Sequence, residues 1–178
     1  VAVIGAGPLG RRLALAALRA GCRVFVEDVM PANLHHAQEE LRAALGPEAL
    51  PAAEFVSTVE EAVRQADLVI DCVPDELESK LEIFCLIDRM APPRTVLATP
   101  MTRHSITDLA SCTYRAEQCI AIAAEAAELM ATEPGELLLR KPPQATEQTI
   151  ALVTEFFASL GFKPRVELET VEPNPAAL

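Results

Sequence analysis

Residues 1–10 read VAVIGAGPLG, an apolar run followed by glycines in the spacing G-x-G-x-x-G. The apolar run predicts a buried strand, and the helical periodicity that begins at Leu9 predicts a helix directly after it. The chain has only seven glycines, and three of them, Gly5, Gly7 and Gly10, fall in this turn. The stretch therefore predicts a strand, a tight turn and a helix as the first unit of an α/β fold.

The rest of the chain alternates in the same way. We predict strands over residues 1–5, 23–27, 54–57, 67–73, 95–99, 119–123, 136–140 and 163–168. We predict helices over residues 9–20, 31–45, 59–65, 76–90, 105–110 and 146–160. This alternation indicates βαβ crossovers and a Rossmann-type, doubly wound, mostly parallel sheet with helices on both faces. We expect one domain over residues 1–168 and a Pro-rich tail over residues 169–178.

Each part of the glycine turn has a use in binding the pyrophosphate of a dinucleotide. Gly5 permits the tight turn, Gly7 lets the backbone approach the phosphates, and Gly10 lets the helix pack closely on the strand. The helix N-terminus offers free N–H groups and a partial positive charge to the anion, although proline at position 8 has no N–H to give. A glycine turn used only for packing is the alternative. We predict a cofactor-binding turn formed by Gly5, Gly7, Pro8, Leu9 and Gly10.

An acidic residue ends the second predicted strand. Asp28 follows Gly5 by 23 positions, close to the spacing of about 20 residues expected for the acid that binds an adenosine ribose hydroxyl. Its carboxylate would repel a 2′-phosphate, so the sequence favours NAD over NADP. Glu27 is adjacent, and strand alternation predicts that its side chain points to the other face.

Composition excludes several kinds of partner. The 178 residues carry a net charge of −11 and have a pI near 4.7, which argues against binding to nucleic acid or to an anionic membrane surface. No apolar run approaches the roughly 20 residues needed to span a bilayer. The five cysteines contain no C-x-x-C pair. We expect a cytoplasmic protein with reduced thiols and no metal site.

With these residues placed, the chain resembles the NAD-binding domain of the 3-hydroxyacyl-CoA dehydrogenase family. The resemblance is strongest in VAVIGAGPLG and the Asp28 strand, and it continues in ADLVIDCVPDELESKLEIF at residues 66–84. It implies an NAD-dependent oxidoreductase that acts on the CH–OH group of a 3-hydroxyacyl-CoA. It also places Asp75 and Lys80 where the family has a Glu and a Lys that contact the cofactor. A charge pair on a solvated helix start is the alternative.

The chain departs from the family where catalysis is expected. The family's S-N-T-S-S becomes TPMTR at residues 99–103, which retains a hydroxyl at Thr102 but replaces the asparagine by Pro100. The family's catalytic histidine corresponds to Ala123. The family orients that histidine with a glutamate about twelve residues on, and the nearby Glu133 and Glu136 do not match it cleanly because Pro134 and Gly135 break the spacing. The family's helical substrate and dimerisation domain has no counterpart in these residues. The resemblance therefore implies a cofactor-binding domain that is weak or inactive as a dehydrogenase by itself.

Other residues near this edge could replace the histidine. Thr102, His104 and Glu125 are the candidate catalytic groups, since each follows a strand that ends at the same edge of the sheet. They would serve a dehydrogenase of a different, smaller hydroxy acid. A non-enzymatic NAD-sensing or interaction module, and a domain that no longer binds cofactor, are further alternatives. A homodimer or a partner chain could supply the missing parts.

Overall fold

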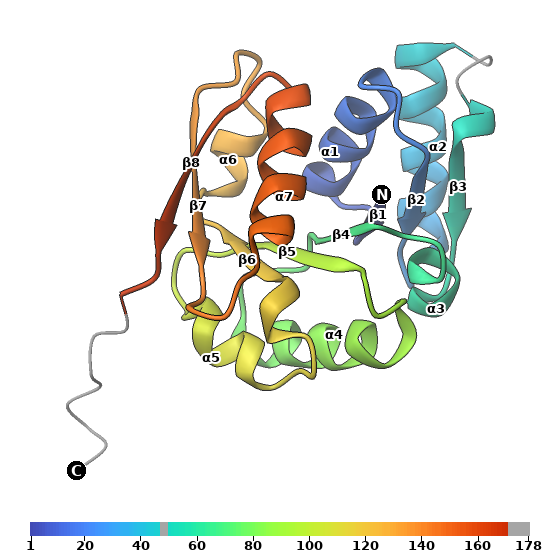
Figure 1. Cartoon of the computed structure of the whole chain (residues 1–178). Helices are drawn as coiled ribbons and strands as arrows, with labels where there is room; N and C mark the ends of the chain where they lie inside the picture. The colour runs from blue at the N-terminus through green and yellow to red at the C-terminus, as the bar shows by residue number, and fades with distance from the viewer. Residues whose placement is uncertain (47–49, 171–178) are drawn as a thin grey trace.

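The computed structural model describes residues 1–46 and 50–170 (Figure 1). The strands are β1 (Ala2–Ile4), β2 (Val24–Glu27), β3 (Ala53–Val56), β4 (Leu68–Asp71), β5 (Val96–Pro100), β6 (Cys119–Ile122), β7 (Glu136–Lys141) and β8 (Lys163–Leu168). The α-helices are α1 (Pro8–Arg19), α2 (Pro31–Leu45), α3 (Val59–Val63), α4 (Leu77–Met90), α5 (Ile106–Ser111), α6 (Ala126–Leu129) and α7 (Glu147–Ser159). Every strand and helix predicted from the sequence is present, and α6 is an addition.

The strands form one sheet in the order β3-β2-β1-β4-β5-β6-β7-β8. All neighbouring pairs are parallel except β6 and β7, which are antiparallel. The chain leaves β3 at one edge and returns beside β1 as β4, so the order reverses between β1 and β4. This reversal is the switch point at which doubly wound sheets bind ligands, and the Rossmann-type prediction is confirmed.

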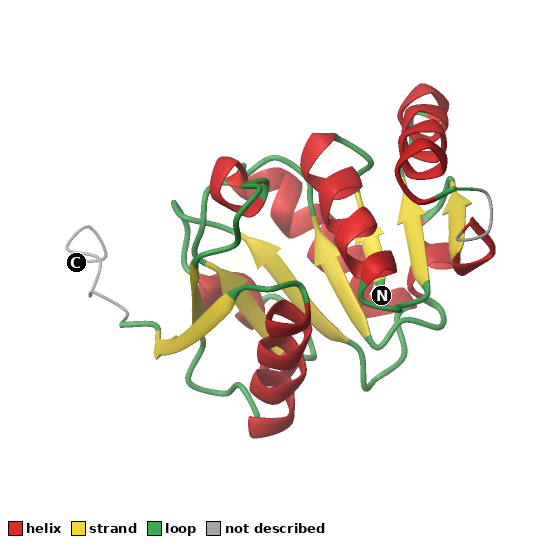
Figure 2. Ribbon diagram, turned by 90° about the horizontal axis from the view of Figure 1, so that it is seen from above, coloured by secondary structure: helices red, strands yellow, loops and turns green. Residues whose placement is uncertain are grey.

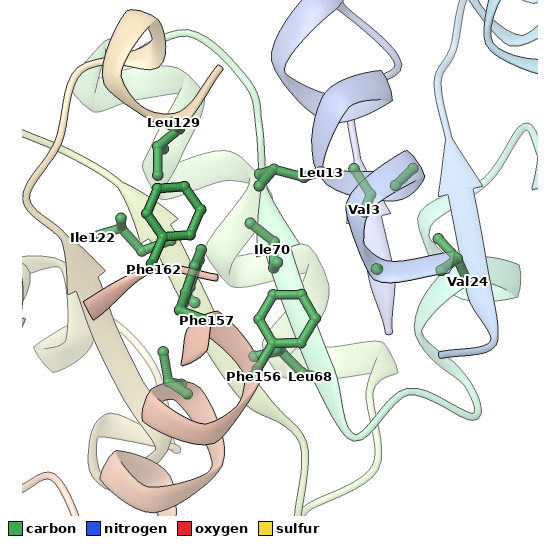
Figure 3. Close-up of a cluster of buried hydrophobic side chains, with 14 of the residues drawn as sticks. Val3, Leu13, Val24, Leu68, Ile70, Ile122, Leu129, Phe156, Phe157 and Phe162 are labelled. Atoms are coloured by element: carbon green, nitrogen blue, oxygen red, sulfur yellow. The ribbon is translucent and has the colours of Figure 1, made fainter. Parts of the chain in front are cut away.

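Helices cover both faces of the sheet, as Figure 2 shows. Helices α1, α2, α6 and α7 pack on one face, and α3, α4 and α5 pack on the other. On the first face, Phe157 lies edge-on to both Phe156 and Phe162, beside Ile122 and Leu129 (Figure 3). Few aromatics are needed elsewhere, because Ala, Val, Leu and Ile fill most of the two apolar layers.

Helix α6 lies where the sequence predicted only an alanine-rich strand end. Glu125 is its N-cap, and the side chains of Glu125 and Glu128 each pair with the backbone N–H of the other, as in a capping box. Leu129 at the end of the helix is buried in the core. The signal in the sequence was the three-residue spacing of the two glutamates, which is the usual spacing of a capping box.

Glu169, the first residue of the predicted tail, is hydrogen-bonded to the N-terminus of α5 and to β7. Glu169 Oε2 accepts from Ser105 Oγ and from Thr107 N, both at 2.8 Å, and Oε1 accepts from Ile106 N at 3.0 Å. The backbone N–H of Glu169 donates to Lys141 O at 2.9 Å. Residues 171–178 of the predicted tail lie outside the described residues.

These contacts predict a pH-dependent contribution to stability. Burial works to raise the pKa of Glu169, but the hydrogen bonds from Thr107, Ser105 and Ile106 outweigh it and lower the pKa below the ordinary 4.5. Because the folded pKa is the lower one, the contribution is fully present above about pH 4.5 and is lost as the pH falls through the folded value. Glu169→Ala should lower the free energy of unfolding at pH 7 by about 1 kcal/mol, as removal of a helix cap does.

Urea unfolding at pH 7 and at pH 3.5 measures this effect. The deficit of Glu169→Ala relative to the parent should shrink at the lower pH. Glu167→Gln is the matched control on β8, because its ion pair with Arg165 is exposed and worth little. An equal deficit at both pH values would contradict the role given to the carboxylate.

Candidate functional site

The glycine turn joins β1 to α1 with a different constraint at each glycine. Gly5 has a φ of +97°, and its N–H donates to Glu27 O at 2.8 Å. A Cβ at Gly10 would overlap the carbonyl oxygen of Gly5, so the helix can approach the strand only with glycine there. A Cβ at Gly7 would meet no atom within 4 Å. Gly7 is therefore free of packing demands, and the space above it is open to a ligand.

The N-terminus of α1 faces this open space. Gly7 is the N-cap, Pro8 is the first helical residue, and no side chain caps the helix. The N–H groups of Leu9 and Gly10 fall in the first turn, where a helix has no internal acceptor for them. Because Pro8 has no N–H, the first turn offers an anion two donors, the N–H groups of Leu9 and Gly10.

A cavity of about 640 Å³ adjoins the turn. Its walls come from the ends of β1, β2 and β4, the helix α4 and the segments between them: Ile4, Gly5, Gly7, Pro8, Glu27, Asp28, Val29, Asn33, Val59, Cys72, Val73, Pro74, Ser79, Glu82, Ile83 and Leu86. A second cavity of about 670 Å³ lies at the opposite ends of these strands, near Arg23 and Asp67. Ligands of open α/β sheets bind at the carboxyl ends of the strands, so the cavity at the glycine turn is the candidate site.

Asp28 lines this cavity and holds the turn in place. Its Oδ2 accepts from Ala6 N at 2.9 Å and from Asn33 Nδ2 at 3.0 Å. Its Oδ1 accepts from Met30 N at 2.8 Å. A carboxylate has about four acceptor positions, and three donors occupy them here, so one position is left for a ribose hydroxyl.

The remaining candidate residues meet beyond the turn. Thr102 Oγ1 donates to Glu125 Oε1 at 2.7 Å, and Thr102 N donates to Asp75 Oδ2 at 3.1 Å. His104 Nε2 lies 4.0 Å from Asp75 Oδ1, an atom that has no hydrogen-bond partner within the described residues. Residues that follow β4, β5 and β6 thus form one cluster, which we call the rim cluster (Asp75, Thr102, His104 and Glu125).

Lys80 of α4 pairs with an acid that the sequence analysis did not single out. Its side chain is fully buried under α4, and Nζ donates to Asp71 Oδ2 at 3.0 Å and to Val73 O at 3.2 Å. Asp71 also accepts from Thr99 Oγ1 at 2.9 Å. Lys80 is fully buried and does not line the cavity, so it is not a charge pair on a solvated helix start. Its contact with the cofactor stays a prediction. The pair instead ties β4, β5 and α4 together beneath the loop that carries Asp75.

Sequence reasoning missed Asp71. The signal was an acid that ends the apolar run LVID, nine residues before a lysine. An isolated charge at the end of a buried strand requires a partner, and helix α4 provides it.

Ala123 directly follows β6, and its N–H donates to Leu138 O at 2.8 Å. Its methyl group can neither take nor give a proton. Glu136, which the sequence places near the family's orienting glutamate, is exposed at the start of β7. Neither side chain therefore shows a general base at the end of β6.

The fold and the cavity agree with the family that the sequence resembles. The family model described as 3-hydroxyacyl-CoA dehydrogenase, NAD binding domain, matches residues 1–166. The chain belongs to the 3-hydroxyacyl-CoA dehydrogenase family. NAD is accordingly its cofactor, as the sequence predicted.

Relatives within the family extend further than this chain does. A probable 3-hydroxybutyryl-CoA dehydrogenase of Bacillus subtilis is 30% identical over 133 residues, which cover 67% of this chain and 46% of the relative. The mitochondrial hydroxyacyl-coenzyme A dehydrogenase of Sus scrofa is 28% identical over 188 residues, which cover 92% of this chain and 57% of the relative. The crystal structure of (S)-3-hydroxybutyryl-CoA dehydrogenase from Ralstonia eutropha has a TM-score of 0.85 at 21% identity, over 95% of this chain and 63% of that one. The chain thus spans about half the length of the curated relatives it matches.

The residues of this NAD-binding domain fit NAD. The open space over Gly7 and the free N–H groups of α1 suit a pyrophosphate, and the cavity beside Asp28 suits an adenosine. Over residues 1–46 and 50–170, no group of three or more His, Cys, Asp or Glu side chains could hold a metal ion. Within the same residues, no helix combines the length and hydropathy required to cross a membrane.

Proposed function

We propose that this chain binds NAD(H) as the nucleotide half of an oxidoreductase for 3-hydroxyacyl-CoA, and that it has little dehydrogenase activity by itself. The proposal rests on the sequence resemblance, which implies that Ala123 stands where the family has its catalytic histidine. Bound NAD supplies the acceptor for a hydride, but the proton of the substrate hydroxyl still needs a base. A positioned base contributes about 10²–10⁴-fold in rate, so its loss leaves slow turnover.

The roles of the other residues follow from their positions. The turn around Gly7 and the α1 N–H groups hold the pyrophosphate, and Asp28 accepts from a ribose hydroxyl. Asp75 lies toward the nicotinamide half, on the loop that the buried Lys80 supports. We further propose that an acyl-CoA or small hydroxy acid is held with help from a homodimer or a partner chain.

Turnover of 3-hydroxybutyryl-CoA tests the proposal. The purified chain should bind NADH but produce it from NAD and substrate at a rate barely above background. Ala123→His should not restore normal rates, because the turn at Pro134 and Gly135 displaces the orienting glutamate and Pro100 replaces the cleft asparagine. Misplacing a reacting group by about 1 Å can cost about 10²-fold. Robust turnover by the unmodified chain would contradict the proposed inactivity and leave the family assignment standing.

The rim cluster favours a second candidate, a dehydrogenase for a smaller hydroxy acid. His104 beside Asp75, and Thr102 bonded to Glu125, form an acid–base set where the sheet ends. If these residues act on substrate, His104→Gln should lower the rate sharply while NADH binding stays unchanged. Tight NADH binding with no turnover of any hydroxy acid would instead support an NAD-sensing module.

A further inference from the structure

Glu27 is a buried acid that the family pattern does not use. It is the last residue of β2, lies beside Ile4 of β1 and Val56 of β3, and is 3% exposed. Its Oε1 has no hydrogen-bond partner in the described part of the chain. A buried carboxyl oxygen without a partner destabilises a fold, so its retention in a strand otherwise made of Val and Phe calls for a reason.

The position of Glu27 supplies that reason. Phe25, two residues earlier on the same face, packs with the core under α3 and α4, so Glu27 points to that side. There it lines the NAD cavity together with Val59 and Ile83, whose apolar side chains suit a flat base. Asp28 turns to the other side, toward Ala6 and Asn33. Two adjacent carboxyls thus flank the cavity from opposite faces of the strand.

The charges around the cavity determine what Glu27 can bind. The lining residues include three acids, Glu27, Asp28 and Glu82, and no Lys, Arg or His. Three donors of the chain already occupy Asp28, whereas an oxygen of Glu27 is free. A ligand group that meets the ionised carboxylate of Glu27 must therefore bring a hydrogen-bond donor.

We propose that Glu27 is a specificity-determining residue of the cofactor site, whose carboxyl accepts a hydrogen bond from a donor on the adenosine half of NAD. The adenine amino group and a ribose hydroxyl share this chemistry. The proposal rests on cofactor binding, which the family assignment gives, and not on the proposed loss of dehydrogenase activity.

Glu27 acts purely as an acceptor only when its carboxyl is ionised. Burial, with a further contribution from the charge of Asp28, raises the pKa of Glu27 to about 7. A group whose pKa is higher in the folded state stabilises the fold at pH values below its unfolded pKa. That contribution is lost as the pH rises through the folded pKa of about 7. Glu27 is therefore a residue whose removal should strengthen the fold while weakening the site.

Glu27→Leu tests this combination, with the Tm and the NADH dissociation constant as the two measurements. The variant should melt roughly 2–4 °C above the parent at pH 8, because an unpaired buried acid is gone. It should bind NADH about tenfold more weakly, because one hydrogen bond to the cofactor is lost. If leucine is too large for this position, Glu27→Val provides the same comparison of Tm and NADH affinity with the parent. Glu54→Gln on the neighbouring strand β3 removes the same charge outside the cavity and should bind NADH like the parent.

Two analogues locate the donor. Nicotinamide hypoxanthine dinucleotide lacks the amino group of adenine, and a 2′-deoxyadenosine analogue of NADH lacks a ribose hydroxyl. The parent should bind one of them weakly, and the tenfold difference between parent and Glu27→Leu should vanish for that analogue. A variant that binds NADH as tightly as the parent, or that weakens all three ligands equally, would overturn the proposal. A folded parent that binds no NADH would overturn it together with the placement of the site.

Discussion

Gly7→Val is expected to weaken NADH binding by at least about 100-fold while the protein stays folded and its Tm is unchanged. The backbone of Gly7 has a φ of −65° and a ψ of −179°, an extended conformation that valine adopts without strain. No atom lies within 4 Å of the Cβ position, so the fold has room for the side chain. That same space is the path by which a pyrophosphate approaches the N-terminus of α1, and two methyl groups there would hold it away from the N–H groups. A 100-fold loss corresponds to about 2.7 kcal/mol.

Gly10→Ala, in the same turn, provides the contrast. Its added methyl group would overlap the carbonyl oxygen of Gly5, so α1 would have to move away from β1. We expect this variant to be strongly destabilised, whatever its affinity for NADH. Isothermal titration with NADH and thermal unfolding of both variants make the comparison. If Gly7→Val bound NADH like the parent, the phosphate site would lie elsewhere.

The parts of the site that the sequence predicted are those fixed by neighbouring residues. The turn from Gly5 to Gly10 is local, because Gly5 is required by its positive φ and Gly10 by its close approach to the carbonyl oxygen of Gly5. Asp28 is nearly local, since it ends the strand paired with β1. The alternation of strands and helices then determines the sheet, because crossovers between parallel strands leave few topologies open.

The parts that the sequence did not predict depend on distant contacts. The glutamate at position 169 caps a helix about 60 residues earlier, at Ser105 and Thr107. The surroundings of the Glu27 side chain depend on α3 and α4, which are distant in sequence and pack over β2. Strand alternation gave the correct face for Glu27, but it could not tell that this face lines the cavity.

Lys80 is the clearest case of a residue whose role depends on distant contacts. Its replacement is also expected to have the second large effect, a loss of stability. Lys80→Met should lower the free energy of unfolding by about 3–5 kcal/mol, the usual loss when one partner of a buried ion pair is removed. Methionine fills most of the space of the lysine stem, so the loss comes from the charge that remains on Asp71, 1% exposed. Val73 N and Thr99 Oγ1 still donate to Asp71, but neither carries a compensating charge. Urea unfolding measures the change, and Lys163→Met on the exposed start of β8 is the control for the substitution itself.

The double variant Asp71→Asn/Lys80→Met separates an ion pair from a cofactor contact. With both charges gone, no unpaired charge is buried, and much of the lost stability should return, since neutral replacements of buried pairs are often tolerated. A lysine on the wall of the cavity would behave in the opposite way. Its loss would leave stability nearly unchanged, it would weaken NADH binding directly, and the second substitution would restore nothing. If Lys80→Met were stable but bound NADH poorly, Lys80 would contact the cofactor directly, as the family pattern implies. An unstable Lys80→Met rescued by Asp71→Asn would establish that this lysine acts on the cofactor only through the loop it supports.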